Sequence, residues 1–239
     1  MTPVCIEISP THAAKLLAAI VCFLGLMHIA GKISALAFGH SYWHGLIPLF
    51  DLDEEFNVPS VYSGLALALS AGLLAITAFA EAKLGRIGHL AFWAFLALVF
   101  LFLATDELFE LHERLAKPVR SALNTTGAFY YAWIIPYGTV VLLFGIFCLR
   151  FLARLPRNIS VPMVLAGTVY LSGAIGMEMI GGALAEELER PEQNPGYVIA
   201  STLEELLEMA GVVIFIHTLL RYLALLGVRI EFGSGVTAD

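Results

Sequence analysis

Five side chains that bind cations or exchange protons lie within eight residues, directly after a long apolar run. On one continuous helix, at about 100° per residue, three carboxylates would share a stripe and a fourth would flank it, with the histidine opposite. Like charges at this spacing repel, so the stripe must meet cations, protons or water. We expect Pro118 to end the helix. The stripe is Asp106, Glu110 and Glu113, the flanking residue is Glu107, and the histidine is His112.

The composition predicts that this cluster belongs to a membrane protein. The 239 residues are 59% hydrophobic and 14% charged, with a mean hydropathy of +0.84, whereas soluble domains carry about 25% charged residues. Crossing a bilayer takes about 20 apolar residues. We predict an all-α fold: one domain over residues 1–239, a polytopic bundle of six transmembrane helices in contact with lipid. The helices are expected near 14–37, 60–81, 88–109, 130–152, 161–184 and 198–222.

The distribution of charge predicts the orientation of the bundle. Eight lysines and arginines fall on the side of the termini and four on the other, which places both termini in the cytoplasm by the positive-inside rule. Of the 20 acids, only Glu7, Glu81, Glu231 and Asp239 lie on the cytoplasmic side. No basic patch for nucleic acid is present. The eight cations are Lys15, Lys83, Arg86, Arg150, Arg154, Arg157, Arg221 and Arg229.

Two further groups of acids fall inside the last two apolar segments. Glu178 lies in GAIGMEMIGG, where small residues allow helices to approach closely. Glu204, Glu205 and Glu208 lie in STLEELLEMAG. An ionisable residue within the membrane costs about 3 kcal/mol and usually faces the bundle interior. We therefore expect Glu107 and the deeper glutamates to converge in a polar cavity that opens outward.

A divalent metal ion is the ligand that this pattern favours, because inward-facing carboxylates and histidines hold metals in helical bundles. No Glu-x-x-His pair occurs, so the di-iron signature is missing, and a mononuclear zinc or manganese site is the remaining form. His40 and His44 offer an alternative zinc site together with His112. The candidate ligands are Glu107, His112, Glu178, Glu205 and Glu208; Lys32, Asp106, Glu110, Glu113 and Glu204 are expected at the cavity mouth or behind the ligands, with Lys32 as a counter-ion.

The first outer loop, FDLDEEFNVPS, offers a separate cation site. Asp51, Asp53, Glu55 and Asn57 alternate along it in the 1, 3, 5, 7 spacing of a calcium loop. Phe56 stands where such a loop needs glycine, and no distal glutamate follows. A solvated loop before a helix start is the alternative.

Three stretches together resemble an uncharacterised family of bacterial six-helix integral membrane proteins. They read DxDxExNxP at 51–59, DExxxxHE at 106–113 and EExxEMxG at 204–211. The resemblance extends from about residue 48 to 222. It implies the six-helix fold and a multi-pass location in the bacterial inner membrane, and it brings no activity.

Two other functions remain open. Acids in transmembrane helices are common in proton- and cation-coupled transporters, although the inner half of this chain offers few polar residues. Alternatively, the acids fix helix register in a non-catalytic accessory subunit, bound to a membrane-complex partner or to a second copy of the chain. No nucleophile–base pair is evident, so the sequence assigns no reaction.

Overall fold

The computed structural model describes residues 4–6, 8–40, 42–228 and 230–232. It confirms the all-α, six-helix prediction, since six helical stretches are long and apolar enough to cross a membrane. Five are single helices, and the fifth in chain order, Arg157–Glu186, is composite. The bounds are α1 Pro10–Phe38, α3 Val58–Lys83, α4 Ile87–Phe109, α6 Ile134–Leu152 and α9 Pro195–Leu225, with α7 Arg157–Leu171, a π-helical segment Ser172–Met177 and α8 Glu178–Glu186 forming the composite stretch.

The starts of three long helices follow from local capping chemistry. Ser9, Asn57 and Asn194 cap α1, α3 and α9, and each side-chain oxygen accepts a hydrogen bond from a backbone N–H of the first turn. Proline occupies the first or second helical position in all three, where its missing N–H is not needed. These caps fix where the chain enters each crossing.

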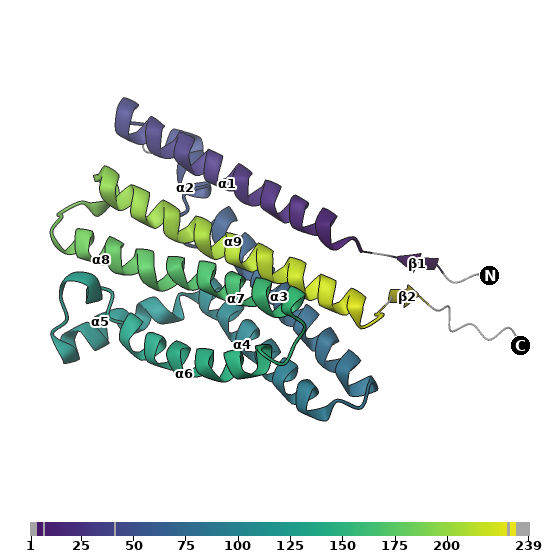
Figure 1. The fold of residues 1–239 in the computed structure, drawn as a ribbon. Coiled ribbons are helices and arrows are strands. Elements are labelled where there is room, and N and C mark those ends of the chain that lie inside the picture. The colour runs from purple at the N-terminus through teal and green to yellow at the C-terminus, as the bar shows by residue number, and fades with distance from the viewer. Residues whose placement is uncertain (1–3, 7, 41, 229, 233–239) are drawn as a thin grey trace, which may run out of the picture.

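The crossings are arranged around α9. This helix packs against α1, α3 and α7, while α3 and α4 form a closely packed hairpin. In Figure 1, α9 lies between α1 and α7, and α6 lies at the edge of the bundle. Short elements join the crossings: α2 Leu46–Leu49, α5 Leu111–Leu123, and 3-10 turns at Trp43–Gly45, Gly127–Phe129 and Pro191–Gln193.

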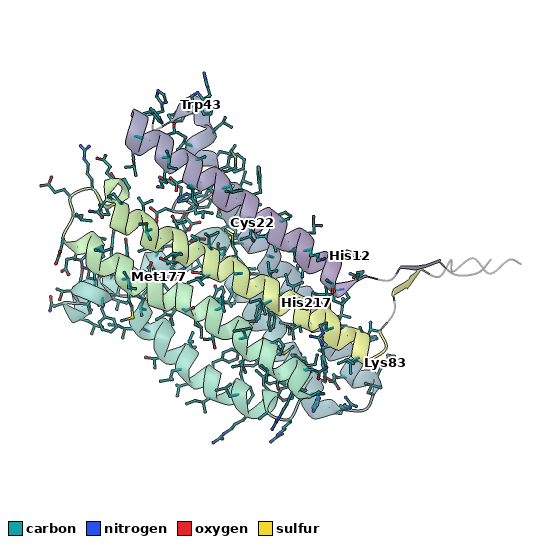
Figure 2. The ribbon with its side chains drawn as sticks, turned by 45° about the horizontal axis from the view of Figure 1, so that its top comes forward. His12, Cys22, Trp43, Lys83, Met177 and His217 are labelled. Atoms are coloured by element: carbon teal, nitrogen blue, oxygen red, sulfur yellow. The ribbon has the colours of Figure 1, made fainter. Side chains whose placement is uncertain are left out.

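Both termini lie at the same end of the bundle (Figure 1). Strand β1, Val4–Ile6, pairs antiparallel with strand β2, Ile230–Phe232, so the two ends of the chain meet. Lys83 and His217 lie toward this end and Trp43 at the opposite one (Figure 2). We call these the termini end and the distal end. Three charges used to predict orientation, Glu7, Arg229 and Asp239, lie outside the described residues.

The largest apolar core fills the half of the bundle near the termini. Side chains from α3, α4, α7 and α9 meet there without exposure to solvent. Burial of this size stabilises a helix by packing rather than by intrinsic propensity. The fully buried members with the largest side chains are Leu74, Trp93, Ile159, Ile216 and Leu219.

The acidic segment does not form one continuous helix, which corrects the stripe predicted from the sequence. Helix α4 ends at Phe109, Glu110 adopts a left-handed conformation with φ of 51°, and α5 begins at Leu111. The turn brings His112 back toward Asp106 instead of directing it away. Pro118 lies inside α5, which continues to Leu123, so the predicted end at this proline is also wrong.

Two glycines allow the composite crossing to approach α9. A Cβ at Gly173 would lie 2.5 Å from the carbonyl oxygen of Glu204, and one at Gly211 would lie 2.8 Å from the backbone nitrogen of Tyr170. Real Cβ atoms do not approach so closely, so a side chain at either position would force the helices apart. Close approach through small residues is the usual packing mode of membrane helices.

Candidate functional site

One cavity of about 180 Å³ lies in the distal half of the bundle. Its walls come from the loop before α3, from α4, α5, α6, α7 and α8, and from the first half of α9. The charged and aromatic residues that line it are Asp53, Glu55, Asp106, Glu107, His112, Glu113, Tyr131, Trp133, Tyr137, Tyr170, Glu178, Tyr197, Glu204, Glu205 and Glu208.

The lining is strongly acidic. Nine of the described residues around the cavity carry a carboxyl group, and His112 is the only one with a basic side chain. All ten could be recognised in the sequence as polar groups, but they come from five separate segments that only the fold brings together. So many carboxyl groups cannot remain ionised side by side without protons or other cations between them.

His112 forms an ion pair with one carboxylate of the cavity. His112 Nδ1 lies 2.8 Å from Asp106 Oδ2, and the Tyr137 hydroxyl donates to Asp106 Oδ1 at 3.0 Å. Burial alone would lower the pKa of His112, but the hydrogen bond and the charge of Asp106 outweigh it and raise that pKa to about 9. The imidazolium and Asp106 therefore neutralise each other at pH 7. Eight carboxyl groups remain.

The deeper carboxyl groups share the cavity wall with aromatic side chains. The indole Nε1 of Trp133 donates to Glu178 Oε1 at 2.9 Å. Glu204, Glu208 and Tyr170 line the same part of the cavity. Carboxyl groups gathered around one cavity need protons or other cations between them.

The loop before α3 contributes two acids to the outer part of the cavity. Burial, followed by repulsion from Glu107, Glu113 and Glu110, raises the pKa of Glu55 to about 8. Burial also raises the pKa of Asp53 to about 6, although the charge of Lys32 opposes that rise. The cavity consequently gains negative charge as pH rises through the neutral range.

The other polar residues of this loop are used to hold it in place. Asp51 Oδ2 lies 2.8 Å from Lys32 Nζ, and the Leu52 amide donates to His28 Nδ1 at 2.9 Å. Asn57 caps α3 and also donates to the Asp51 carbonyl at 2.6 Å. Lys32 therefore pairs with Asp51 of the loop. The sequence had indicated a different partner, one of the glutamates that converge on the cavity.

The structure brings together most of the candidate residues and leaves six elsewhere. Glu107, His112, Glu178, Glu205 and Glu208, the predicted metal ligands, all line the cavity, together with Asp106, Glu113 and Glu204. Their binding of a metal stays a prediction. The residues that do not line the cavity are Lys32, Glu110, Asp51 and Asn57, and likewise His40 and His44, which follow α1 in a non-helical link.

Within the described residues, no three His, Cys, Asp or Glu side chains stand close enough together to hold a metal ion. A metal would therefore need carboxyl groups from different helices to move inward. His112 would also have to lose its proton, since only the neutral ring is a ligand. Oxygen ligands alone favour hard ions such as Mn²⁺ or Ca²⁺ over zinc.

Sequence analysis missed the aromatic part of the lining. The hydroxyl groups of Tyr131 and Tyr197 lie 3.3 Å apart, and the Tyr197 hydroxyl donates to Asp53 at 3.4 Å. The sequence does link Tyr197 to the acids. Tyr197, Ser201, Glu204 and Glu208 follow one another at spacings of four, three and four residues, which places them on one face of a helix. No comparable signal joins Tyr131 to the acids, since it lies before α6 begins.

A family model described as "Domain of unknown function (DUF8692)" matches residues 11–223, which include nearly all of the six crossings and every residue around the cavity. The chain belongs to this family. Membership of DUF8692 agrees with an uncharacterised membrane family and assigns no activity. No curated protein and no solved structure matches the chain.

Proposed function

We propose that the distal cavity is a binding site for a cation that enters from outside the cytoplasm, in a protein of the bacterial inner membrane. The observation that carries this proposal is the lining: nine carboxyl groups against one histidine, which Asp106 already neutralises. The remaining negative charge needs a counter-ion, and a cavity of about 180 Å³ has room for one.

An organic ammonium group fits this lining better than a single metal ion. The aromatic rings of Tyr131, Trp133, Tyr137 and Tyr197 share the walls with the carboxyl groups, and aromatic faces attract ammonium groups. A volume of about 180 Å³ also exceeds what one metal ion needs. We therefore favour an amine with two or more charges, held by carboxylates at each end.

A divalent metal ion, predicted from the sequence, is the second candidate. That Glu178 and Glu204 line the same cavity from α8 and α9 supports it, because a metal ion can replace protons among neighbouring carboxyl groups. In that case Glu107, Glu178, Glu205 and Glu208 would hold the ion through oxygen atoms. His112 would stabilise Asp106 without touching the metal.

The packing beneath the cavity supports binding rather than passage. Leu74, Trp93, Ile216 and Leu219 fill the bundle between the cavity and the termini end without solvent exposure. A transporter would have to open this core in every cycle. No observation favours that alternative over a cavity closed at its base.

Calorimetric titration of the purified full-length chain in nanodiscs tests the proposal, with Mn²⁺, Ca²⁺ and the diamine putrescine as separate probes. We expect saturable binding of putrescine, weakened roughly tenfold or more in Glu178→Gln and in Glu208→Gln, because each removes a charged partner. Glu187→Gln is the matched control, since Glu187 is exposed at the same end and does not line the cavity.

Each outcome decides between the candidates. Binding of Mn²⁺ or Ca²⁺ with the same sensitivity to the two cavity variants would keep the cation site and replace the amine by a metal. If none of the three probes binds, or if Glu187→Gln weakens binding as much as the cavity variants, the cation site is wrong.

A further inference from the structure

Helix α5, Leu111–Leu123, belongs to neither the apolar crossings nor the buried core. It follows α4 after the single residue Glu110, at the point where α4 ends its crossing. Its 13 residues span about 20 Å, too short to cross a bilayer. None of its side chains is buried, and the element that it contacts most in the described chain is the preceding helix, α4.

The side chains of α5 separate into two faces. At about 100° per residue, Leu111, Leu115, Val119 and Ala122 fall within about 80° of one another. Leu115 on this face is 42% exposed and Ala122 is exposed as well, while Leu111 and Val119 are half-buried. Leu123, next to this face, is 55% exposed. The described protein therefore leaves part of the apolar face uncovered.

The opposite face carries three cations, Arg114, Lys117 and Arg120, and one acid, Glu113, within an arc of about 120°. No ion pair involves any of them within the part of the chain that the structure describes. Arg120 lies over the ring of Tyr130, with 3.7 Å between guanidinium carbon and ring centroid. With three cations and one acid, the polar face carries a net positive charge next to an acidic cavity.

The helix is fixed to the bundle at both ends. His112 near its start contacts Asp106 of α4, and Arg120 near its end stacks on Tyr130, just before α6. Tyr130 in turn lies against Gly182 of α8, where an added Cβ would come within 3.3 Å of it. These contacts hold α5 against the distal end of the bundle, beside the end of the α4 crossing.

From this placement, we infer that α5 lies in the membrane interface and binds the headgroups of anionic phospholipids. Short helices with an apolar face and a cationic face adopt this position, with the apolar side among the upper acyl carbons and the charges at the headgroups. Three cations attract anionic lipid, each by an amount that salt reduces. The occupant of the free face is thus the bilayer that the six crossings already span.

Quenching by brominated lipids tests this assignment in the full-length chain, with its three native cysteines replaced by serine. A bimane probe is attached at Leu115→Cys on the apolar face or at Ser121→Cys on the polar face. The vesicles contain brominated phosphatidylglycerol or brominated phosphatidylcholine at equal mole fraction. We expect strong quenching at position 115 and weak quenching at 121, and about fivefold stronger quenching at 115 by the anionic lipid.

The double variant Arg114→Gln, Lys117→Gln should abolish this preference while leaving quenching by the neutral lipid intact. Arg154→Gln, Arg157→Gln, which removes the same charge at the other end of the bundle, should preserve it. Crosslinking of the unmodified chain to photoactivatable forms of the two lipids, mapped by mass spectrometry, gives the same comparison without substitutions. Equal labelling of α5 by both lipids, or no quenching at position 115 by either, would overturn the assignment.

Discussion

Removing the charge of Glu55 should stabilise the protein at alkaline pH and have little effect at acidic pH. Its pKa rises from 4.5 to about 8 because of burial and the repulsion of neighbouring glutamates. A group whose pKa is raised by folding favours the folded state while it is protonated. This contribution to the free energy of unfolding is lost as pH rises from 4.5 through 8. Glu55→Gln keeps its stability over the same range because glutamine does not ionise.

The shift from 4.5 to about 8 corresponds to an upper value of about 5 kcal/mol. Glu55 is partly exposed, so solvent screening reduces the effect, and we expect about 2 kcal/mol. For a chain of this length, that difference raises the Tm of Glu55→Gln above wild type by about 5 °C at pH 9. At pH 5 the two proteins should melt together.

Differential scanning fluorimetry in detergent, at several pH values and without added divalent cation or amine, measures this difference. Glu54→Gln is the control, because Glu54 is the adjacent acid, is exposed and does not line the cavity. The reasoning is refuted if Glu55→Gln gives the same Tm difference at pH 5 and pH 9, or if Glu54→Gln reproduces the effect.

Three further predictions concern the same region. The affinity for a bound cation should increase between pH 6 and pH 9, since Glu55 loses its proton there, and calorimetry at a series of pH values should detect no such increase in Glu55→Gln. Gly173→Ala should lower the free energy of unfolding by about 2 kcal/mol because it forces α9 away, whereas Gly176→Ala, which faces open space, should lower it far less; thermal melts compare the two. Lys32→Met should cost about 3 kcal/mol because it leaves Asp51 buried without its cation, and addition of Asp51→Asn should recover most of that loss in the same assay.

Much of the fold could be predicted from the sequence because membrane crossings have a simple physical requirement. Each needs about 20 apolar residues, and the predicted 88–109 and 60–81 differ from α4 and α3 by at most two residues at either end. The change of direction at Glu110 could not be predicted. A left-handed residue other than glycine has no reliable sequence pattern. Helical periodicity therefore predicts one continuous helix through Glu110, where α4 in fact ends.

The acids of the candidate site could be listed from the sequence, but their partners could not. Intramembrane glutamates are rare enough to be noticed singly, and Glu178, Glu205 and Glu208 do line one cavity. Tyr131 and Trp133, in contrast, stand at the start of a predicted crossing, where aromatic residues are typical of the membrane interface whether or not they line a site. Only the packing of α8 against the 3-10 turn Gly127–Phe129, just before these residues, places both rings at the cavity that Glu178 lines.

The apolar core beneath the cavity has an electrical consequence. In a membrane under voltage, the potential falls across the part that water does not fill, which here is the packed half around Trp93 and Leu219. Under the proposed function, a cation enters from the distal end and would cross little of that drop on its way to Glu208, although moving a charge across the full potential is worth about 2.3 kcal/mol per 100 mV. Occupancy should then follow the external concentration of the ligand and remain unchanged when valinomycin and a potassium gradient polarise the vesicles.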